Sequence, residues 1–351
     1  METSSLNTWV ELSAAAYAAN LRFFASASGR VSELAAVVKA NAYGHGWREI
    51  AQLAVRAGAD SFCVHSLEEA LELRAAGFAH DVLIMGHVPL ARLETAVTAG
   101  FRLVLYNRES LERLGEITER EGSTARVHLK LETGTYRQGV DERELGGFLA
   151  ALTARRGVRL EGVYTHFANI EDTTSHEFAI EQRQRFERMA AVVEAGGFAP
   201  LLRHAACSAA TLLFPETHLG MVRLGISQYG LWPSKETFLS YTLEHGRPAV
   251  PVLEPVLSWK ARISQVKRVP AGSFVGYGCS FQTTRETLLA VLPVGYSDGY
   301  DRRLSNQAHV LVRGRRAPVR GRICMNLMMI DVTDVAGVEL EDEVRSARAP
   351  G

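Results

Sequence analysis

Eight short apolar runs, rich in β-branched residues, alternate with longer segments of helical pattern in the first two thirds of this 351-residue chain. The runs are 34–40, 61–66, 81–86, 101–107, 126–132, 160–167, 201–207 and 221–226. Near-continuous apolar runs are typical of parallel strands that are covered on both faces. The alternation therefore predicts an α/β fold, a (β/α)8 TIM barrel, with an open doubly wound sheet as the alternative.

Helix signals separate the runs. Ser66 and Glu69 have the spacing of a capping box, and Gly77 stands where that helix should end. Other glycines follow amphipathic stretches and suit the position just after a helix: Gly58, Gly100, Gly122, Gly157 and Gly196. These signals for helix starts and ends support the alternation of strands and helices.

The texture changes after Leu231. Prolines cluster at Pro233, Pro248, Pro251 and Pro255, and short β-type runs with turn residues follow them. We expect a barrel domain over residues 1–240 and a mostly β domain over 241–351. The first ten or so residues are candidates to pair with the β domain.

Composition excludes several classes of partner. Lys plus Arg (39) equals Asp plus Glu (39), so no bulk charge attracts nucleic acid or an anionic membrane. The four scattered cysteines match no metal spacing, and a disulfide framework is not expected. The start lacks a signal-peptide pattern, and no apolar stretch approaches the roughly 18 residues of a membrane span. We expect a cytoplasmic protein without a metal.

Polar residues occupy the ends of the predicted strands, which in a barrel face the active-site mouth. They are Lys39, Lys130, Thr133, Arg137, His166, Ser208, Arg223 and Gly225. Each has an ordinary interpretation too. Lys39 is either a nucleophile or a lysine whose head reaches solvent, and Ser208 is a candidate helix N-cap. Arg223 is harder to dismiss, because an arginine inside an apolar strand needs a buried acceptor.

Segments spread along the chain together resemble the alanine racemase family, enzymes of fold type III that use pyridoxal phosphate. The matching segments, in family order, are VVKANAYGHG, KLETGTYRQG, THFANIE, AACSAA, MVRLGISQYG, VGYGCSF, LPVGYSDGYDRRLSN and RGRICMNLMMIDV. The resemblance runs to about residue 342.

The resemblance implies a cofactor site. Lys39 matches the lysine that carries pyridoxal 5'-phosphate covalently, and Arg223 matches the arginine that faces the pyridine nitrogen. The cofactor phosphate is contacted in the family at the positions of Tyr43, Ser208, Gly225 and Ile226. A guanidinium only donates, so the ring nitrogen opposite Arg223 is expected to stay unprotonated.

It also implies substrate contacts. Arg137 matches an arginine near the cofactor phenolate and the substrate carboxylate, and Lys130 a lysine that is carbamylated in many members and orients that arginine. Met325 matches a partner-subunit residue whose backbone N–H binds the carboxylate, and Tyr296 a tyrosine of the access corridor.

Tyr277 matches a second catalytic base that the partner subunit supplies, and His166 the histidine bonded to it. We therefore expect a homodimer that interconverts L- and D-alanine, supplying D-alanine for peptidoglycan. Lys39 would serve the proton of the D-isomer and Tyr277 that of the L-isomer. Because tyrosine is a weak base at neutral pH, a His166–Arg223 relay is expected to assist it. The alternatives are a related racemase or decarboxylase for another amino acid, and a cofactor-binding homologue without catalysis.

Two departures from the family stand out. Family members continue with further β structure and a phosphate-contacting tyrosine, whereas this sequence ends in RSARAPG, which shows no strand pattern. We expect a β domain that is incomplete at its C-terminus. Asn326 stands where many members have aspartate, which keeps a hydrogen-bonding side chain without the charge.

Overall fold

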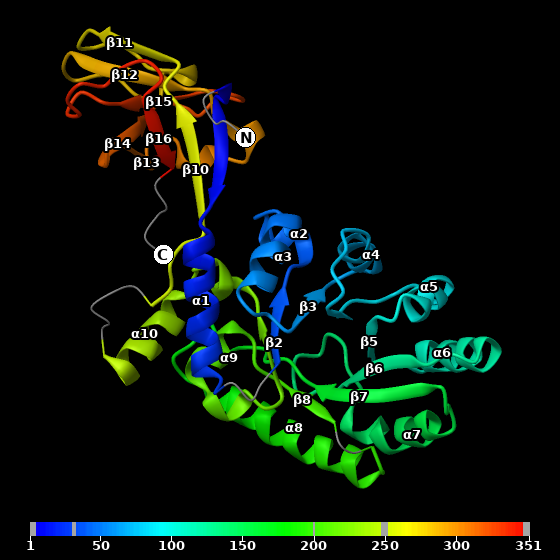
Figure 1. Cartoon of the computed structure of the whole chain (residues 1–351). Coiled ribbons are helices and arrows are strands. Elements are labelled where there is room, and N and C mark those ends of the chain that lie inside the picture. Colours follow the sequence, from blue (N-terminus) through cyan, green and yellow to red (C-terminus); the bar gives the residue numbers. More distant parts are fainter. Residues whose placement is uncertain (1–4, 30–32, 199–200, 247–251, 347–351) are drawn as a thin grey trace. The chain divides into compact units, whose positions relative to one another are not determined.

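The computed structural model describes residues 5–29, 33–198, 201–246 and 252–346 (Figure 1). By its contacts the chain divides into two compact units, Ala14–Val256 and the described part of Met1–Ser13 with Leu257–Gly351. Pro248, Pro251 and the last residues of RSARAPG lie outside the described residues.

All eight runs of the first unit form strands of one parallel sheet, in the order β8-β7-β6-β5-β4-β3-β2-β9. They are β2 (Glu33–Val37), β3 (Ser61–Val64), β4 (Asp81–Ile84), β5 (Arg102–Leu105), β6 (Ala125–Lys130), β7 (Val158–Tyr164), β8 (Leu202–His204) and β9 (Met221–Leu224). The two end strands are joined by backbone hydrogen bonds, from Gly220 N–H to Arg203 O (2.9 Å) and from Arg223 N–H to Ala206 O (3.1 Å). The sheet is thus a nearly closed barrel, as predicted, and the open sheet is excluded.

Helices follow the outer side of the curved sheet (Figure 1). The α-helices are α1 (Ala14–Ala27), α3 (Trp47–Arg56), α4 (Leu67–Ala75), α5 (Leu93–Thr98), α6 (Arg108–Glu121), α7 (Glu142–Thr153), α8 (Glu177–Ala195), α9 (Ser208–Leu213) and α10 (Lys235–His245). Short 3-10 turns lie at η2 (Leu90–Arg92), η3 (Pro215–Thr217) and η4 (Ile226–Tyr229). The sequence pattern missed α10, which begins among prolines and is capped by the Ser234 side chain.

Helix ends agree with most of the expected signals. The capping box of α4 is present, because Ser66 Oγ accepts the Glu69 N–H and the Glu69 side chain accepts the Ser66 N–H. Gly58, Gly77, Gly100 and Gly122 have positive φ, as expected after a helix. Gly196 also follows its helix directly, as the C-cap of α8, but its φ is −74° and the positive φ falls on the next residue, Gly197, at +90°. The expectation is wrong for Gly157, because α7 ends at Thr153 and has Ala154 as its C-cap.

The second unit is one antiparallel sheet in the order β1-β10-β16-β13-β14-β15-β12-β11. Its strands are β1 (Thr8–Leu12), β10 (Leu257–Arg262), β11 (Gln265–Val269), β12 (Thr287–Leu292), β13 (His309–Val312), β14 (Arg315–Arg320), β15 (Met328–Asp331) and β16 (Glu343–Ser346). Short turns lie at η5 (Tyr277–Cys279), η6 (Tyr296–Asp298) and η7 (Arg302–Leu304). β1 pairs with β10 from Thr8 opposite Ala261 to Leu12 opposite Leu257.

The last described strand corrects one expectation. RSARAPG shows no strand pattern, yet Arg345 and Ser346 belong to β16, which pairs with β10 and β13. The physical reason is tertiary, because partners on both sides supply backbone hydrogen bonds and Val344 packs into the sheet core at 1% exposure.

Among the helices of the described residues, none has the length and apolar character needed to cross a membrane.

Candidate active site

The C-terminal ends of the barrel strands surround a cavity of about 640 Å³. Nine residues singled out from the sequence line it: Lys39, Tyr43, Lys130, Arg137, His166, Ser208, Arg223, Gly225 and Ile226. They lie in or just after β2, β6, β7, β8 and β9, so the barrel topology gathers segments that lie far apart in sequence. Thr133 is buried and does not line the cavity, and its hydroxyl forms a hydrogen bond with the hydroxyl of Thr165 at 2.7 Å.

Lys39 opens an unusual turn, α2 (Lys39–Tyr43). Ala40, Asn41, Ala42 and Tyr43 have φ between +51° and +56°, so four consecutive non-glycine residues are left-handed. Left-handed helical backbone costs roughly 1–2 kcal/mol per residue for L-amino acids. The turn keeps helical bonds of its own, among them Gly44 N–H to Ala40 O at 3.2 Å. Contacts from outside must hold it in this strained form.

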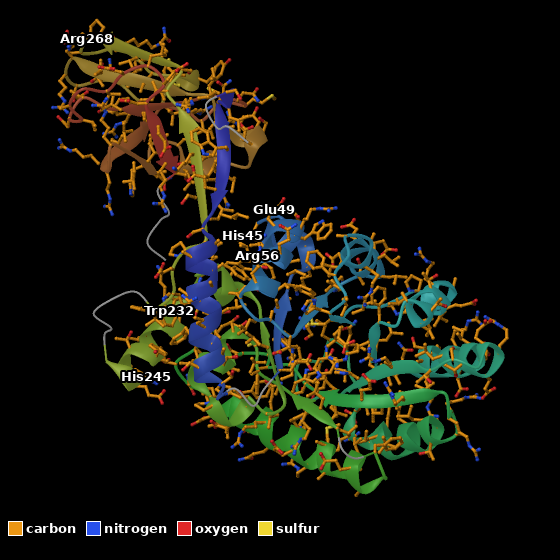
Figure 2. All side chains as sticks on the ribbon, in the orientation of Figure 1. His45, Glu49, Arg56, Trp232, His245 and Arg268 are labelled. Atoms are coloured by element: carbon orange, nitrogen blue, oxygen red, sulfur yellow. The ribbon has the colours of Figure 1, made fainter. Side chains whose placement is uncertain are left out.

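Aromatic packing braces one side of this turn. Tyr229 donates its hydroxyl to Val37 O (2.9 Å) at the end of β2. His45 (labelled in Figure 2) stacks on Tyr229 with ring centroids 4.2 Å apart, and its Nδ1 lies 3.1 Å from Ala42 O. The carbonyl can only accept, so Nδ1 carries the proton in that contact. The turn is thereby tied to the barrel strand that leads into it.

Ser208, Gly225 and Tyr43 form a small cradle. Ser208 is the first residue of α9 rather than its N-cap, which is Cys207, so the expected capping role is wrong. Its Oγ instead accepts the N–H groups of Gly225 (3.0 Å) and Ser227 (3.3 Å). A Cβ on Gly225 would lie 2.8 Å from Tyr43 Oη, so only glycine leaves this space open. Burial raises the pKa of Tyr43 to about 12, which keeps its hydroxyl a donor.

Arg223 is buried beneath the mouth with its donors directed at three acceptors. Nη1 donates to His204 Nδ1 (2.5 Å), and Nη2 donates to Thr165 O and Ala205 O (both 3.0 Å). A guanidinium has no acceptor, so His204 Nδ1 must accept and its Nε2 must carry the proton. That proton points at His128 Nδ1, 2.9 Å away. Arg223 thus fixes the tautomers of two buried histidines.

The histidines of the mouth are neutral. Burial, followed by the nearby charge of Arg223, lowers the pKa of His166 to about 3. Burial first, then Arg102, lowers the pKa of His128 to about 3, and burial lowers that of His204 far below its usual range. The expected link from His166 to Arg223 does not occur among the hydrogen bonds of the described residues. Arg223 bonds His204 instead, and its charge acts on His166 only through space.

Lys130 and Arg137 bring further positive charge. Burial, then the charges of Arg137 and Arg223, lowers the pKa of Lys130 to about 8. Its Nζ lies 5.7 Å from the ring centroid of Tyr164, which also stacks on His204 at 4.6 Å. The loop to Arg137 is fixed by Glu132, whose carboxylate accepts the N–H groups of Gly134 and Thr135.

The three other residues implied by the resemblance lie in the second unit. Tyr277, Met325 and Tyr296 are 70%, 55% and 41% exposed. Tyr277 and Cys324 line one hollow, and the N–H of Tyr296 bonds Cys324 O at 3.0 Å, so these segments form one face. Gly295 permits this approach, because a Cβ there would lie 2.3 Å from Cys324 O and Met325 O. Asn326 Nδ2 donates to Ser297 Oγ (2.8 Å) on the same face.

Sequence reasoning missed His128 and His204 as parts of the site. Both are histidines inside apolar strand runs, at the fully buried core of the barrel. A buried polar residue in such a run requires a partner, and this was the signal available. The sequence alone does not show that Arg223 bonds His204 and that His204 bonds His128, because these contacts join three different strands, β9, β8 and β6.

The fold and the barrel mouth define a class of protein: a (β/α)8 barrel whose cavity brings lysine and arginine side chains together around the amine of Lys39. Family models agree with it. "Alanine racemase, N-terminal domain" matches residues 12–233 and "Alanine racemase, C-terminal domain" matches residues 256–347. The chain therefore belongs to the alanine racemase family.

Relatives match along nearly the whole chain. The alanine racemase of Symbiobacterium thermophilum is 42% identical over 338 residues, 96% of this chain and 86% of the relative. That of Leptospira interrogans serovar Lai is 40% identical over 336 residues, 95% of this chain and 85% of the relative.

Solved structures are similar as well. The alanine racemase of Streptomyces lavendulae superposes with a TM-score of 0.88 at 35% identity, covering 97% of this chain and 87% of that one. The alanine racemase of Bartonella henselae, with covalently bound pyridoxal phosphate, has a TM-score of 0.84 at 28% identity, covering 98% and 91%.

Proposed function

We propose that this chain is a pyridoxal-phosphate-dependent racemase that interconverts L- and D-alanine as a homodimer. The observation that supports this most is the convergence of nine family-matched residues on one cavity around Lys39. A structural protein has no need to gather Lys39, Lys130, Arg137 and Arg223 at one barrel mouth, because like charges repel one another there.

The cavity fits pyridoxal phosphate in charge and shape. Its lining holds four lysine or arginine side chains and one carboxylate, that of Glu171, so the site favours an anion. The cradle of Ser208, Gly225 and Tyr43 offers the hydroxyl groups of Ser208 and Tyr43 as donors, and beside Gly225 a space that a Cβ would fill. In this proposal Lys39 carries the group covalently, Ser208, Gly225, Ile226 and Tyr43 hold its phosphate, and Arg223 faces its ring nitrogen.

When bound, pyridoxal phosphate supplies the electron sink that makes the Cα proton of alanine removable. The residues then decide where the proton goes. Lys39 Nζ would hold or return it on one face of Cα, and Tyr277 Oη of a second copy would do so on the other. Two bases on opposite faces allow inversion, whereas a single base would return the proton to the side it came from.

Arg223 would act on the ring nitrogen as a hydrogen-bond donor, because a guanidinium has no acceptor. Both hydrogens of Nη2 and one of Nη1 bond Thr165 O, Ala205 O and His204, which leaves the other Nη1 hydrogen and the Nε–H as donors toward the ring nitrogen. A guanidinium does not lose its proton at any working pH. A ring nitrogen facing it can only accept. This limits the electron sink and favours prompt return of the proton. The neutral His166 would bond Tyr277 as a hydrogen-bond partner rather than as a cation.

Substrate recognition would combine both units. Arg137 at the mouth would bind the alanine carboxylate together with the backbone N–H of Met325 from the second copy. Lys130, carrying a carbamate, would orient Arg137. Tyr296 of the second copy would narrow the access corridor, which favours a side chain as small as a methyl group.

The exposed face of the second unit supports the homodimer. Phe274, Tyr277, Met325, Leu327 and Tyr296 are between 41% and 70% exposed. Exposed apolar side chains gathered on one face are typical of an interaction surface. We propose that the barrel mouth of a second copy covers this face, so that each site is completed by two chains.

We also propose that the enzyme works in the cytoplasm and supplies D-alanine for peptidoglycan. The racemase reaction makes the D-isomer from the common L-amino acid, which is what a D-alanine-containing wall polymer consumes.

A substrate panel tests the proposal. Purified protein with pyridoxal phosphate is incubated with L-alanine and other L-amino acids, and chiral chromatography detects the D-isomers. We expect D-alanine to form fastest, and Lys39→Ala to lose at least about a thousandfold in rate. Faster racemisation or decarboxylation of another amino acid would favour a related enzyme. Cofactor binding without any turnover would favour a homologue without catalysis.

A further inference from the structure

Glu69 does not line the mouth cavity, yet its carboxylate holds the chain beside Lys39. Oε1 accepts the N–H of Ala40 at 2.7 Å. Oε2 accepts the N–H groups of His65 at 2.7 Å and of Ser66 at 3.2 Å, just after β3. One side chain thus joins the turn after β2 to the segment after β3.

This bridge continues the pairing of β2 with β3. The regular ladder places Val37 opposite Cys63, and the Val38 N–H still donates to Cys63 O at 3.0 Å. Beyond Val38 the backbone leaves the ladder and becomes left-handed. The Glu69 carboxylate takes the place of the missing carbonyl. The N–H groups of both neighbours of Lys39, Val38 and Ala40, are therefore tied to the β3 side.

We propose that Glu69 is a positioning residue for Lys39, acting through the left-handed turn. Four left-handed residues in a row relax unless their surroundings fix them, and relaxation at Ala40 would redirect the Cα–Cβ bond of Lys39. An ionised carboxylate accepts several N–H bonds at once, which suits three converging donors. This inference rests on the proposed function of Lys39 as the residue that carries the cofactor.

Ser66 provides a matched control, because Glu69 also belongs to the capping box of α4. Ser66→Ala removes the acceptor of the Glu69 N–H (3.3 Å) and weakens the same cap. It leaves the bond from Ala40 N–H to the Glu69 carboxylate in place. Glu69→Gln keeps the size of the side chain but turns an amide donor toward N–H groups, so its effect should fall between those of Glu69→Ala and Ser66→Ala.

Reductive labelling tests the proposal directly. The Lys39 amine condenses with the aldehyde of added pyridoxal phosphate and releases water, and borohydride then delivers hydride to the C=N bond. Peptide mass mapping follows the labelled fraction at Lys39. We expect labelling and kcat of Glu69→Ala to fall about tenfold with little change in the alanine KM, because misplacing a reacting group lowers the rate more than binding. Ser66→Ala should stay within about twofold of wild type in both.

Amide hydrogen exchange adds a readout that needs no cofactor. Exchange in a peptide covering residues 38–46 should accelerate in Glu69→Ala and Glu69→Gln, and should stay as in wild type in Ser66→Ala. Equal labelling and exchange in Glu69→Ala and Ser66→Ala would overturn the inference about Glu69 and leave the proposed function of Lys39 standing. Wild-type protein that labels elsewhere than at Lys39 would overturn the proposed function, and the inference with it.

Discussion

Single residues beneath the mouth fix one another's protonation. The chain from Arg223 through His204 to His128 leaves one hydrogen-bonding arrangement, because the guanidinium only donates. Tyr164 stacks on His204 and lies 5.1 Å from the Arg223 guanidinium, which adds a cation–π contact. The electrostatic character of the mouth is thereby set before any ligand binds.

Arg223→Lys tests this arrangement. A lysine ammonium cannot span His204, Thr165 O and Ala205 O, so buried acceptors lose their donors. We expect the free energy of unfolding to fall by about 2–4 kcal/mol, measured by urea denaturation. Arg203→Lys is the control, because that half-buried arginine pairs with Glu187 and should lose less than about 1 kcal/mol. Equal losses in the two variants would contradict the account.

Lys130 should form a carbamate with a distinctive pH dependence. Its pKa is lowered to about 8, so the reactive neutral amine grows as the pH rises through 8. The amine nitrogen bonds to carbon dioxide and releases a proton. At fixed total ¹³C-bicarbonate, the carbamate signal in NMR should rise from about pH 7 and level off near pH 9, whereas an ordinary lysine climbs further. Lys130→Met should lack the signal, and a signal still climbing steeply above pH 9 would refute this assignment.

Prediction from sequence succeeded for residues whose position follows from the strand pattern. Lys39, His166 and Arg223 end or occupy apolar runs, and the barrel rule places such residues at the mouth. Prediction from sequence did not identify which side chains bond one another. His204 was not singled out, although it is the residue that Arg223 bonds, because side-chain contacts between strands depend on register and stagger. Ser208 was correctly placed at the start of α9, but its hydroxyl serves Gly225 and Ser227.

At the scale of elements, the turn after β2 shows where local reasoning ends. The glycines and Asn41 indicate a tight turn, but local preferences disfavour a left-handed run through Ala40 and Ala42. Contacts from Tyr229, His45 and Glu69 override that preference. β16 is a similar case, since its neighbours rather than its sequence pattern make it a strand.

Asn41→Ala tests the turn as an element. Asn41 tolerates the left-handed region, and its Oδ1 accepts the Trp47 N–H (2.9 Å) at the start of α3. We expect a loss of about 1–2 kcal/mol in the free energy of unfolding and slower labelling of Lys39 by pyridoxal phosphate. Asn107→Ala removes the cap of α6 and should cost similar stability. Labelling that is slowed equally in both variants would show that general destabilisation, not the turn, is responsible.

In the whole molecule, the proposed mechanism requires two chains for each site. Lys39→Ala and Tyr277→Ala should both be inactive alone. After subunit exchange, half of the dimers are mixed, and each mixed dimer holds one intact site and one doubly altered site. We expect about a quarter of the wild-type rate, because the two-fold symmetry exchanges the contributions of the chains. Chiral chromatography measures the recovery, and no recovery in a mixture shown to contain mixed dimers would mean that Lys39 and Tyr277 serve a site within one chain.

In the proposed mechanism, Lys39 and Tyr277 handle the Cα proton from opposite faces. The most direct measurement follows alanine by NMR in D₂O with the Tyr277→Phe holoenzyme. We expect D-alanine still to exchange its Cα hydrogen for deuterium through Lys39, while formation of L-alanine falls at least about a hundredfold. Lys39→Ala should neither exchange D-alanine nor racemise it. Racemisation by Tyr277→Phe at the wild-type rate would contradict the two-base account.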